Sequence, residues 1–135
     1  MKPYLHARIS AKKNGGDPED YMEIHNWFDH TKAHIADMRH RALLHNAWGI
    51  YLCEQIFGDI VQQADGSFKK TSYITNSEGK KVQVRDIAEQ HVLDDMGRIP
   101  SVYEAMQHLP MLNWLGGPIR KKKVIKMSDL PETVD

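Results

Sequence analysis

The stretch HNWFDHTKAHIADMRHRALLHNAWGIYLCEQIFG, residues 25–58, decides the fold that we expect for this chain of 135 residues. It holds five of the eight histidines, two of the three tryptophans and the only cysteine. From residue 42 to Phe57 apolar residues occupy most of the helix circumference, which is typical of a central, buried helix. We therefore expect one helix over 32–57, with Gly49 as the place for a bend and Gly58 as its end.

Shorter helices are expected on both sides of this stretch. The sequence DPED at 17–20 supplies a capping residue, a proline for the first turn and acidic residues for the positive end of the dipole, which predicts a helix over 18–28. A second helix is expected over 86–96, with a glycine at its end. A capping box opens a third over 101–109.

Between the central helix and residue 86 the pattern changes to alternating and β-branched residues with glycine-containing turns at 65–66 and 76–79. The expected strands are 60–63, 68–75 and 81–85, and residues 3–9 are expected to form a strand or an extended arm. The sequence thus predicts a mostly helical α+β protein, with a long central helix, two or three packed helices and a small antiparallel hairpin or meander.

The chain length fits one domain, which we place at 1–115 with the hairpin region inserted at about 59–85. A tail with a basic and then an acidic part follows at 116–135. Eighteen basic and eighteen acidic residues balance, so no overall charge directs the chain to nucleic acid or a membrane. A single cysteine excludes an internal disulfide, and no apolar run approaches the ~20 residues of a membrane span, so we expect a cytoplasmic protein.

The histidines are the candidate chemical groups. His25 and His91 each have an aspartate four residues later, and His45 lies on a separate stripe of the central helix. Three inward histidines from three helices can close on one divalent ion such as zinc, with the carboxylates orienting the rings. The same pattern fits buried histidines that are satisfied by neighbouring carboxylates. His30 and His34 form a weaker HxxxH pair.

Charged residues offer further candidates. Arg39 and Arg41 lie beside the histidines and can hold a phosphate through paired hydrogen bonds. Glu54 falls on the apolar side of the central helix, so it needs a cation, for which Arg85 is the candidate. Such a pair is compatible with a structural ion pair or with a functional site.

The segments HARISAKKNGG, IHNWFDHTKAH, RHRALLHNAWGIYLCEQIFG and NSEGKKVQVRDIAEQHVLDDMGRIPS resemble a family of small uncharacterised proteins from bacteria and their phages. The resemblance covers residues 6 to about 101. Residues 61–72 look like an addition to the family pattern, and the tail after Trp114 lies outside it. The resemblance implies a bacterial or phage origin and no reaction.

Two functions remain open from the sequence. The first is a non-catalytic accessory protein with a histidine-rich core that binds a protein partner or assembles with itself. The alternative is a metal-dependent phosphoester hydrolase or nucleotide- or nucleic-acid-processing enzyme that uses the inward histidines with Arg39 and Arg41. The cluster Arg120, Lys121, Lys122 and Lys123 in the tail is a candidate contact with a partner or a nucleic acid, with salt-dependent affinity.

Overall fold

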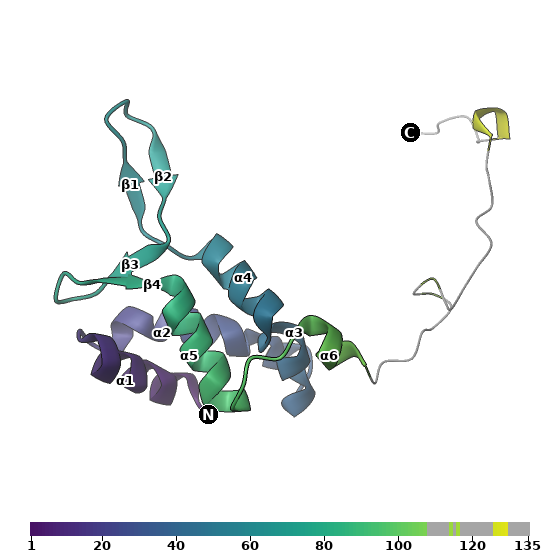
Figure 1. Cartoon of the computed structure of the whole chain (residues 1–135), viewed down its shortest axis with the longest axis horizontal. Helices are drawn as coiled ribbons and strands as arrows, with labels where there is room; N and C mark the ends of the chain where they lie inside the picture. Colours follow the sequence, from purple (N-terminus) through teal and green to yellow (C-terminus); the bar gives the residue numbers. More distant parts are fainter. Residues whose placement is uncertain (108–113, 115, 117–125, 130–135) are drawn as a thin grey trace.

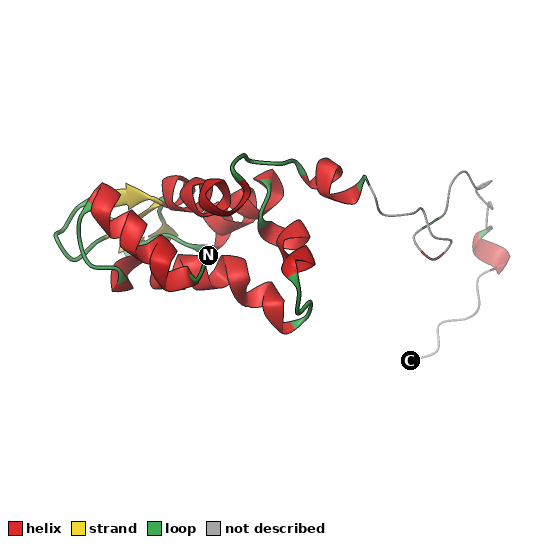
Figure 2. Cartoon of the chain, turned by 90° about the horizontal axis from the view of Figure 1, so that it is seen from below, coloured by secondary structure: helices red, strands yellow, loops and turns green. Residues whose placement is uncertain are grey.

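A computed structural model describes residues 1–107, 114, 116 and 126–129 (Figure 1). The mostly helical α+β class expected from the sequence is confirmed. The α-helices are α1 (Pro3–Asn14), α2 (Glu19–Asp29), α3 (Arg41–Leu44), α4 (Ala47–Ile56), α5 (Val84–Met96) and α6 (Val102–Met106). Short 3-10 turns η1 (His30–Ala33), η2 (Met38–His40) and η4 (Met127–Asp129) complete the helical elements of the described residues. In Figure 2, which views the molecule from below, the strands lie at one end of the helical body.

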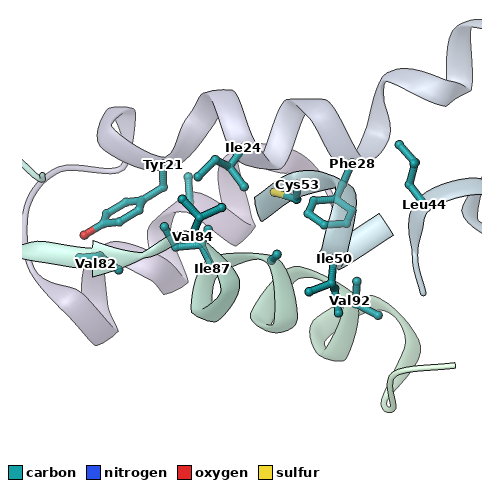
Figure 3. Close-up of a cluster of buried hydrophobic side chains, with 12 residues drawn as sticks. Tyr21, Ile24, Phe28, Leu44, Ile50, Cys53, Val82, Val84, Ile87 and Val92 are labelled. Atoms are coloured by element: carbon teal, nitrogen blue, oxygen red, sulfur yellow. The ribbon is translucent and has the colours of Figure 1, made fainter. Parts of the chain in front are cut away.

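Helix α5 packs against α1, α2 and α4, and these contacts create the core. Figure 3 shows Ile87 and Val92 of α5 facing Ile24 and Phe28 of α2, with Cys53 of α4 between the helices. Because α5 contacts three helices, the side chains of its inner face meet residues from distant parts of the sequence. This arrangement also places His91 of α5 among the buried residues of the other helices.

The strand or extended arm expected at 3–9 is wrong, because these residues belong to helix α1. Pro3 occupies the first turn, where a missing amide hydrogen costs nothing. The buried residues of α1 are His6, Ala7 and Ser10, so its inner face is largely polar. A search for apolar periodicity does not detect such a helix, because the residues that turn inward are a histidine and a serine.

The continuous helix expected over 32–57 is also wrong. Asp37 has extended backbone and accepts a hydrogen bond from the Arg39 amide, which opens the turn η2. Asn46 is extended as well, and its side chain accepts from the amide of Gly49 to cap α4. The expected helix is therefore interrupted twice, at 34–37 and at 45–46, and neither break falls at Gly49. Glycine is required at position 49, since a Cβ there would lie 1.7 Å from the carbonyl oxygen of Leu44.

The strands form two separate antiparallel hairpins, β1 (Ile60–Gln62) with β2 (Phe68–Lys70) and β3 (Tyr73–Thr75) with β4 (Lys81–Gln83). The first hairpin projects from the body in Figure 1. Its base is held by Lys70, whose Nζ donates to the carbonyls of Glu54 (2.9 Å), Phe57 (3.0 Å) and Thr71 (2.8 Å). Two of these carbonyls belong to the end of α4, where a cation is favourable.

Several sequence expectations agree with the structure. Helix α2 falls within one residue of the expected 18–28, and α5 begins two residues before the expected 86. The capping box is present between Ser101 and Glu104 at the start of α6. The expected end of this helix at Leu109 and the basic cluster of the tail lie outside the described residues. No helix among the described residues is both long and apolar enough to cross a membrane.

Candidate metal centre

Five histidines are buried where α1, α2, α3 and α5 meet. The rings come from separate parts of the chain and are enclosed together with two aspartate side chains, Asp29 at the end of α2 and Asp95 in the last turn of α5. Each buried histidine is at most 1% exposed, and the Asp29 and Asp95 side chains are 6% and 1% exposed. The buried histidines are His6, His25, His40, His45 and His91.

Four donor atoms converge at one point of this cluster: Nε2 of His45, Nε2 of His91, Oδ1 of Asp29 and Oδ2 of Asp95. The His45 nitrogen lies 3.1 Å from that of His91, 3.0 Å from Asp95 and 3.4 Å from Asp29. The His91 nitrogen lies 3.4 Å from Asp95 and 3.5 Å from Asp29. Metal–ligand bonds of about 2.0–2.2 Å place neighbouring ligands about 3.0–3.5 Å apart in octahedral or tetrahedral geometry. The donor spacing therefore fits one divalent ion.

Both aspartates are ionised in this setting. Burial opposes the charge on Asp29, but the hydrogen bond from His45 outweighs it and holds the pKa of Asp29 below its usual range. Burial likewise opposes the charge on Asp95, and hydrogen bonds from His45 and His6 hold its pKa far below the usual range. The same contacts outweigh burial at His45 and raise its pKa. Asp95 already contacts the N-terminal ammonium (3.1 Å) and Arg41 (3.6 Å), and the charge of the two carboxylates is compatible with a further cation between them.

The protonation of the neighbouring groups can be read from the hydrogen bonds of Gln90. Its side-chain nitrogen lies 3.0 Å from the carbonyl of His6 and 3.1 Å from a carboxylate oxygen of Asp94, and both of these are acceptors. Its amide oxygen therefore faces Ser10, whose hydroxyl donates to it over 2.8 Å. Ser10 then has only lone pairs left for another neighbour.

That neighbour is His25. Its Nε2 lies 2.7 Å from the Ser10 hydroxyl oxygen and must carry the hydrogen of this bond. Burial and the repulsion of His91 and His6 lower the pKa of His25 to about 3, so the ring is neutral and its Nδ1 is an acceptor. The Nδ1 of His91 lies 2.9 Å away and donates to it. His91 therefore presents a lone pair on Nε2, which is the form that binds metal.

A second group, His6, His25 and His91, also has ring nitrogens within 4.8 Å of one another. Its geometry suits a metal less well, because the rings are stacked: the His6 and His91 centroids lie 3.8 Å apart with 27° between the planes. A metal binds in the plane of an imidazole, along the nitrogen lone pair, whereas stacked rings face one another with their π-surfaces. His6 instead contacts Asp94 (3.2 Å) and Asp95 (3.1 Å) through its two nitrogens.

A pocket of about 470 Å³ adjoins the four-donor centre. His45 lines it, and so does Arg41, whose Nη2 lies 3.6 Å from Asp95 Oδ1. Four buried side-chain atoms of this region have no hydrogen-bond partner: Oδ2 of Asp29, Nε2 of His40, Nε of Arg41 and Nδ1 of His45. Two more arginines complete the basic lining, Arg39 and Arg98.

The three histidines expected to form the site are brought together, in a different way from that expected. His45 and His91 join the four-donor centre, whereas His25 lies behind His91 and contacts its other nitrogen. A single ion bound by all three rings is therefore not what the geometry favours. Asp29 was expected to orient His25, but it faces His45 and His91 instead.

The other predicted residues separate into two places. Arg39 and Arg41 line the pocket beside the centre, and Arg39 is exposed and paired with Asp37 at 2.7 Å. Glu54 is 30% exposed and 4.0 Å from Arg85, whose closer partner is Glu89 at 2.7 Å, so the expected buried ion pair is a weak surface contact. His30 and His34 are exposed and belong to neither metal-compatible group of the described residues.

Sequence reasoning missed part of the site. His6, Ser10 and Gln90 were not singled out, and the aspartates were expected as partners of the rings rather than as ligands. One signal was present in the sequence: His6 and Ser10 are four residues apart and would share the inner face of a helix. The shared face is not apparent when residues 3–9 are taken as an extended segment.

The comparisons with known proteins add a family and no activity. The model of a family described as "Domain of unknown function (DUF6915)" matches residues 1–115. No curated protein and no solved structure matches the chain.

Proposed function

Since the chain belongs to this family of unknown function, we propose its function from the geometry: the protein binds one divalent metal ion through Asp29, His45, His91 and Asp95 and uses it to hydrolyse a phosphoester. The observation that carries the proposal is the convergence of the four donor atoms, with five of their six separations between 3.0 and 3.5 Å.

Hydrogen-bond bookkeeping supports a metal over a shared proton. With His91 Nε2 unprotonated, Nε2 of His45 supplies the one ring hydrogen available at this point, and three acceptors surround it. One hydrogen satisfies one acceptor well, and an unsatisfied buried carboxylate is costly. A divalent ion binds all four ligand atoms at once and neutralises both carboxylates. Two nitrogens and two oxygens suit zinc, iron or manganese.

The adjoining pocket supports hydrolysis of a phosphate ester. Arg41 reaches from the pocket to Asp95, so a phosphate held by its guanidinium would lie beside the metal ligands. A bound divalent ion supplies a Lewis acid and lowers the pKa of a water molecule. In the reaction, water oxygen forms a bond to phosphorus and the ester P–O bond breaks. The hydroxyl of water stays on phosphate, and its remaining hydrogen passes to the alcohol that leaves.

The chain's own residues have separate roles in this proposal. His45 and Asp29 hold the ion from the side of α2 and α3, and His91 and Asp95 hold it from α5. His25 keeps His91 in the tautomer that leaves Nε2 free. The guanidinium of Arg41 neutralises the phosphate and positions it.

The test begins with the full chain purified without a histidine tag. Its metal content is measured by elemental analysis after dialysis, and hydrolysis of p-nitrophenyl phosphate is measured with manganese, iron or zinc added. We expect about one ion per chain and activity that chelator removes. Protein that binds no divalent ion under any of these conditions would remove the proposal.

A second candidate is the non-catalytic accessory protein, with the metal in a structural role. Its support is an apolar exposed surface on α3 and α4, where Leu43, Trp48, Tyr51 and Ile56 are 45–52% exposed. Trp48 and Tyr51 stack with ring centroids 5.6 Å apart. Surfaces of this kind mark contacts with a partner or a second copy. Light scattering on the full chain would detect self-assembly, and activity without it would favour the hydrolase.

The setting forms part of the same proposal. A chain with one cysteine suits the reducing cytoplasm, and we propose a bacterial or phage-infected cell as its place. The tail cations Arg120, Lys121, Lys122 and Lys123 lie outside the described residues. Their contact with a partner or a nucleic acid stays a prediction, to be tested by binding at several salt concentrations.

A further inference from the structure

We infer that the pocket beside the metal centre binds a nucleoside monophosphate, with the phosphate at Arg41 and the nucleoside toward the outer wall. This inference rests on the proposed function for the role of the metal and goes beyond it by naming the substrate class. Its basis is the combination of basic and apolar groups in one pocket.

Three arginines of the pocket determine where the phosphate of the nucleotide would bind. Arg39, Arg41 and Arg98 come from η2, from the start of α3 and from the segment after α5, and they line the same pocket. Each has a carboxylate partner, Asp37 for Arg39 and Glu104 for Arg98, while Arg41 is 3.6 Å from Asp95. A guanidinium has five hydrogen-bond donors, so each pairing leaves donors free for phosphate oxygens.

Arg41 is the arginine that fixes the position of the phosphate. Its side chain is 20% exposed, against 84% for Arg39 and 62% for Arg98, and its buried Nε has no partner. It is also the one that contacts a residue of the metal centre. A phosphate that pairs with Arg41 is therefore drawn to the inner end of the pocket.

The rest of the lining suits a nucleoside. Met38 and Met96 bring flexible thioethers, which pack well against aromatic rings. Ala42, Pro100 and Ala105 add small apolar surfaces. On α6, Glu104 supplies a carboxylate, and Gln107 just after the helix supplies an amide. These groups can bond to ribose hydroxyls or to the edge of a base.

The size agrees with one nucleotide. At about 470 Å³ the pocket lies in the range of small-molecule sites, roughly 300–1,000 Å³. An isolated inorganic phosphate would leave the apolar wall uncovered. We therefore expect the base to add affinity that the phosphate and sugar do not supply.

The experiment uses the full chain, freed of metal with a chelator so that no hydrolysis interferes, and isothermal titration calorimetry. The ligands are AMP, ribose 5-phosphate, adenosine and inorganic phosphate. AMP is expected to bind about 10-fold or more tightly than ribose 5-phosphate, since base packing contributes at this level. It should also exceed adenosine, which lacks the phosphate. Equal affinity for AMP and ribose 5-phosphate would overturn the inference.

Matched variants locate the binding. Arg98→Gln removes a pocket arginine that is paired with Glu104, and Arg85→Gln removes an arginine of similar exposure that is paired with Glu89 elsewhere. We expect weaker AMP binding in the first variant and none of this loss in the second. Met96→Ala should reduce AMP affinity and leave that for ribose 5-phosphate unchanged. Equal effects of Arg98→Gln and Arg85→Gln on AMP would contradict the inference.

The two proposals fail separately. AMP binding of the expected pattern in a protein that takes up no metal would keep the nucleotide pocket and remove the hydrolase. Metal uptake with hydrolysis of p-nitrophenyl phosphate, but without preference for AMP over ribose 5-phosphate, would keep the hydrolase and remove the nucleotide.

Discussion

The Nε2 atoms of His45 and His91 lie 3.1 Å apart although the residues are separated by 46 positions in the chain. With the hydrogen of His91 on Nδ1, where it is donated to His25, the two Nε2 atoms share one hydrogen at most. Asp29 and Asp95 approach the same point with a carboxylate oxygen each. The proposed metal ion between these four atoms would account for their approach.

Asp29→Asn should abolish tight metal binding. The substitution keeps the size of the side chain but removes one of two negative charges at the centre. In the wild type, metal at about 100 times its Kd should stabilise the fold by about 2.7 kcal/mol, seen as a rise in Tm. Asp29→Asn should lose this rise, and the exposed Asp86→Asn should keep it. An unchanged metal-dependent Tm in Asp29→Asn would show that Asp29 is no ligand.

Ser10→Ala should weaken metal binding without removing a ligand. Ser10 accepts the Nε2 hydrogen of His25 and thereby leaves the Nδ1 of His25 to accept from His91. Loss of such a supporting contact lowers metal affinity by about 10–100-fold. Calorimetric titration with zinc measures it. Ser72→Ala is the control, since this hydroxyl bonds to Gln83 on the exposed hairpin region. Equal zinc affinities in both variants would contradict the supporting role of the hydrogen bonds from Ser10 through His25 to His91.

Lys70→Met should destabilise the protein by about 1–3 kcal/mol, because three carbonyls at the base of the first hairpin lose a charged donor. Lys69→Met changes the neighbouring lysine, which is exposed, and should have little effect. Urea unfolding followed by circular dichroism compares the two. Equal midpoints would show that Lys70 does not anchor the hairpin.

Asp20→Asn should cost stability at neutral pH and little at acid pH. Burial opposes the charge on Asp20, but hydrogen bonds from the amides of Ser77 and Asp17 outweigh it and lower the pKa from 3.8. A carboxyl with a lowered folded pKa stabilises the fold above its unfolded pKa and loses this contribution as pH falls through the folded value. Urea unfolding at several pH values should show the wild type and Asp20→Asn converging below about pH 4. A constant difference would contradict the assignment.

Cys53 should be unreactive in the folded protein. Burial raises the pKa of its thiol to about 12, so almost no thiolate forms at pH 8. Ellman's reagent should detect no thiol in native protein and one per chain in denaturant, since the chain has a single cysteine. Rapid reaction of the native protein would mean that α4 opens readily.

The sequence predicted local features well where capping residues and turn residues decide the structure. The start of α2, the capping box of Ser101 and Glu104, and the glycine turns of both hairpins fall where expected. Helix α1 was missed because its inner face carries His6 and Ser10. The break at Asn46 was missed because apolar periodicity continues through it, although the asparagine side chain caps the next helix.

The candidate site was predicted in its composition and only in part in its arrangement. His45 and His91 were expected to point inward together, and Arg41 was expected beside them. The sequence alone assigned Asp29 to His25 because the two are four residues apart. The fold places Asp29 against His45 and His91, since the chain turns at the end of α2 and α5 packs across it.

By itself, the sequence determined that this protein is a mostly helical single chain with an unusual supply of histidines, because helical spacing, caps and turns act over a few residues. Only the tertiary structure decided which histidines and carboxylates share a site. Residues 25–58, which seemed the centre of the molecule, supply His45 and Asp29. Helix α5 supplies His91 and Asp95, and α1 supplies the contacts behind them. Packing of distant helices sets these distances, and no local pattern records it.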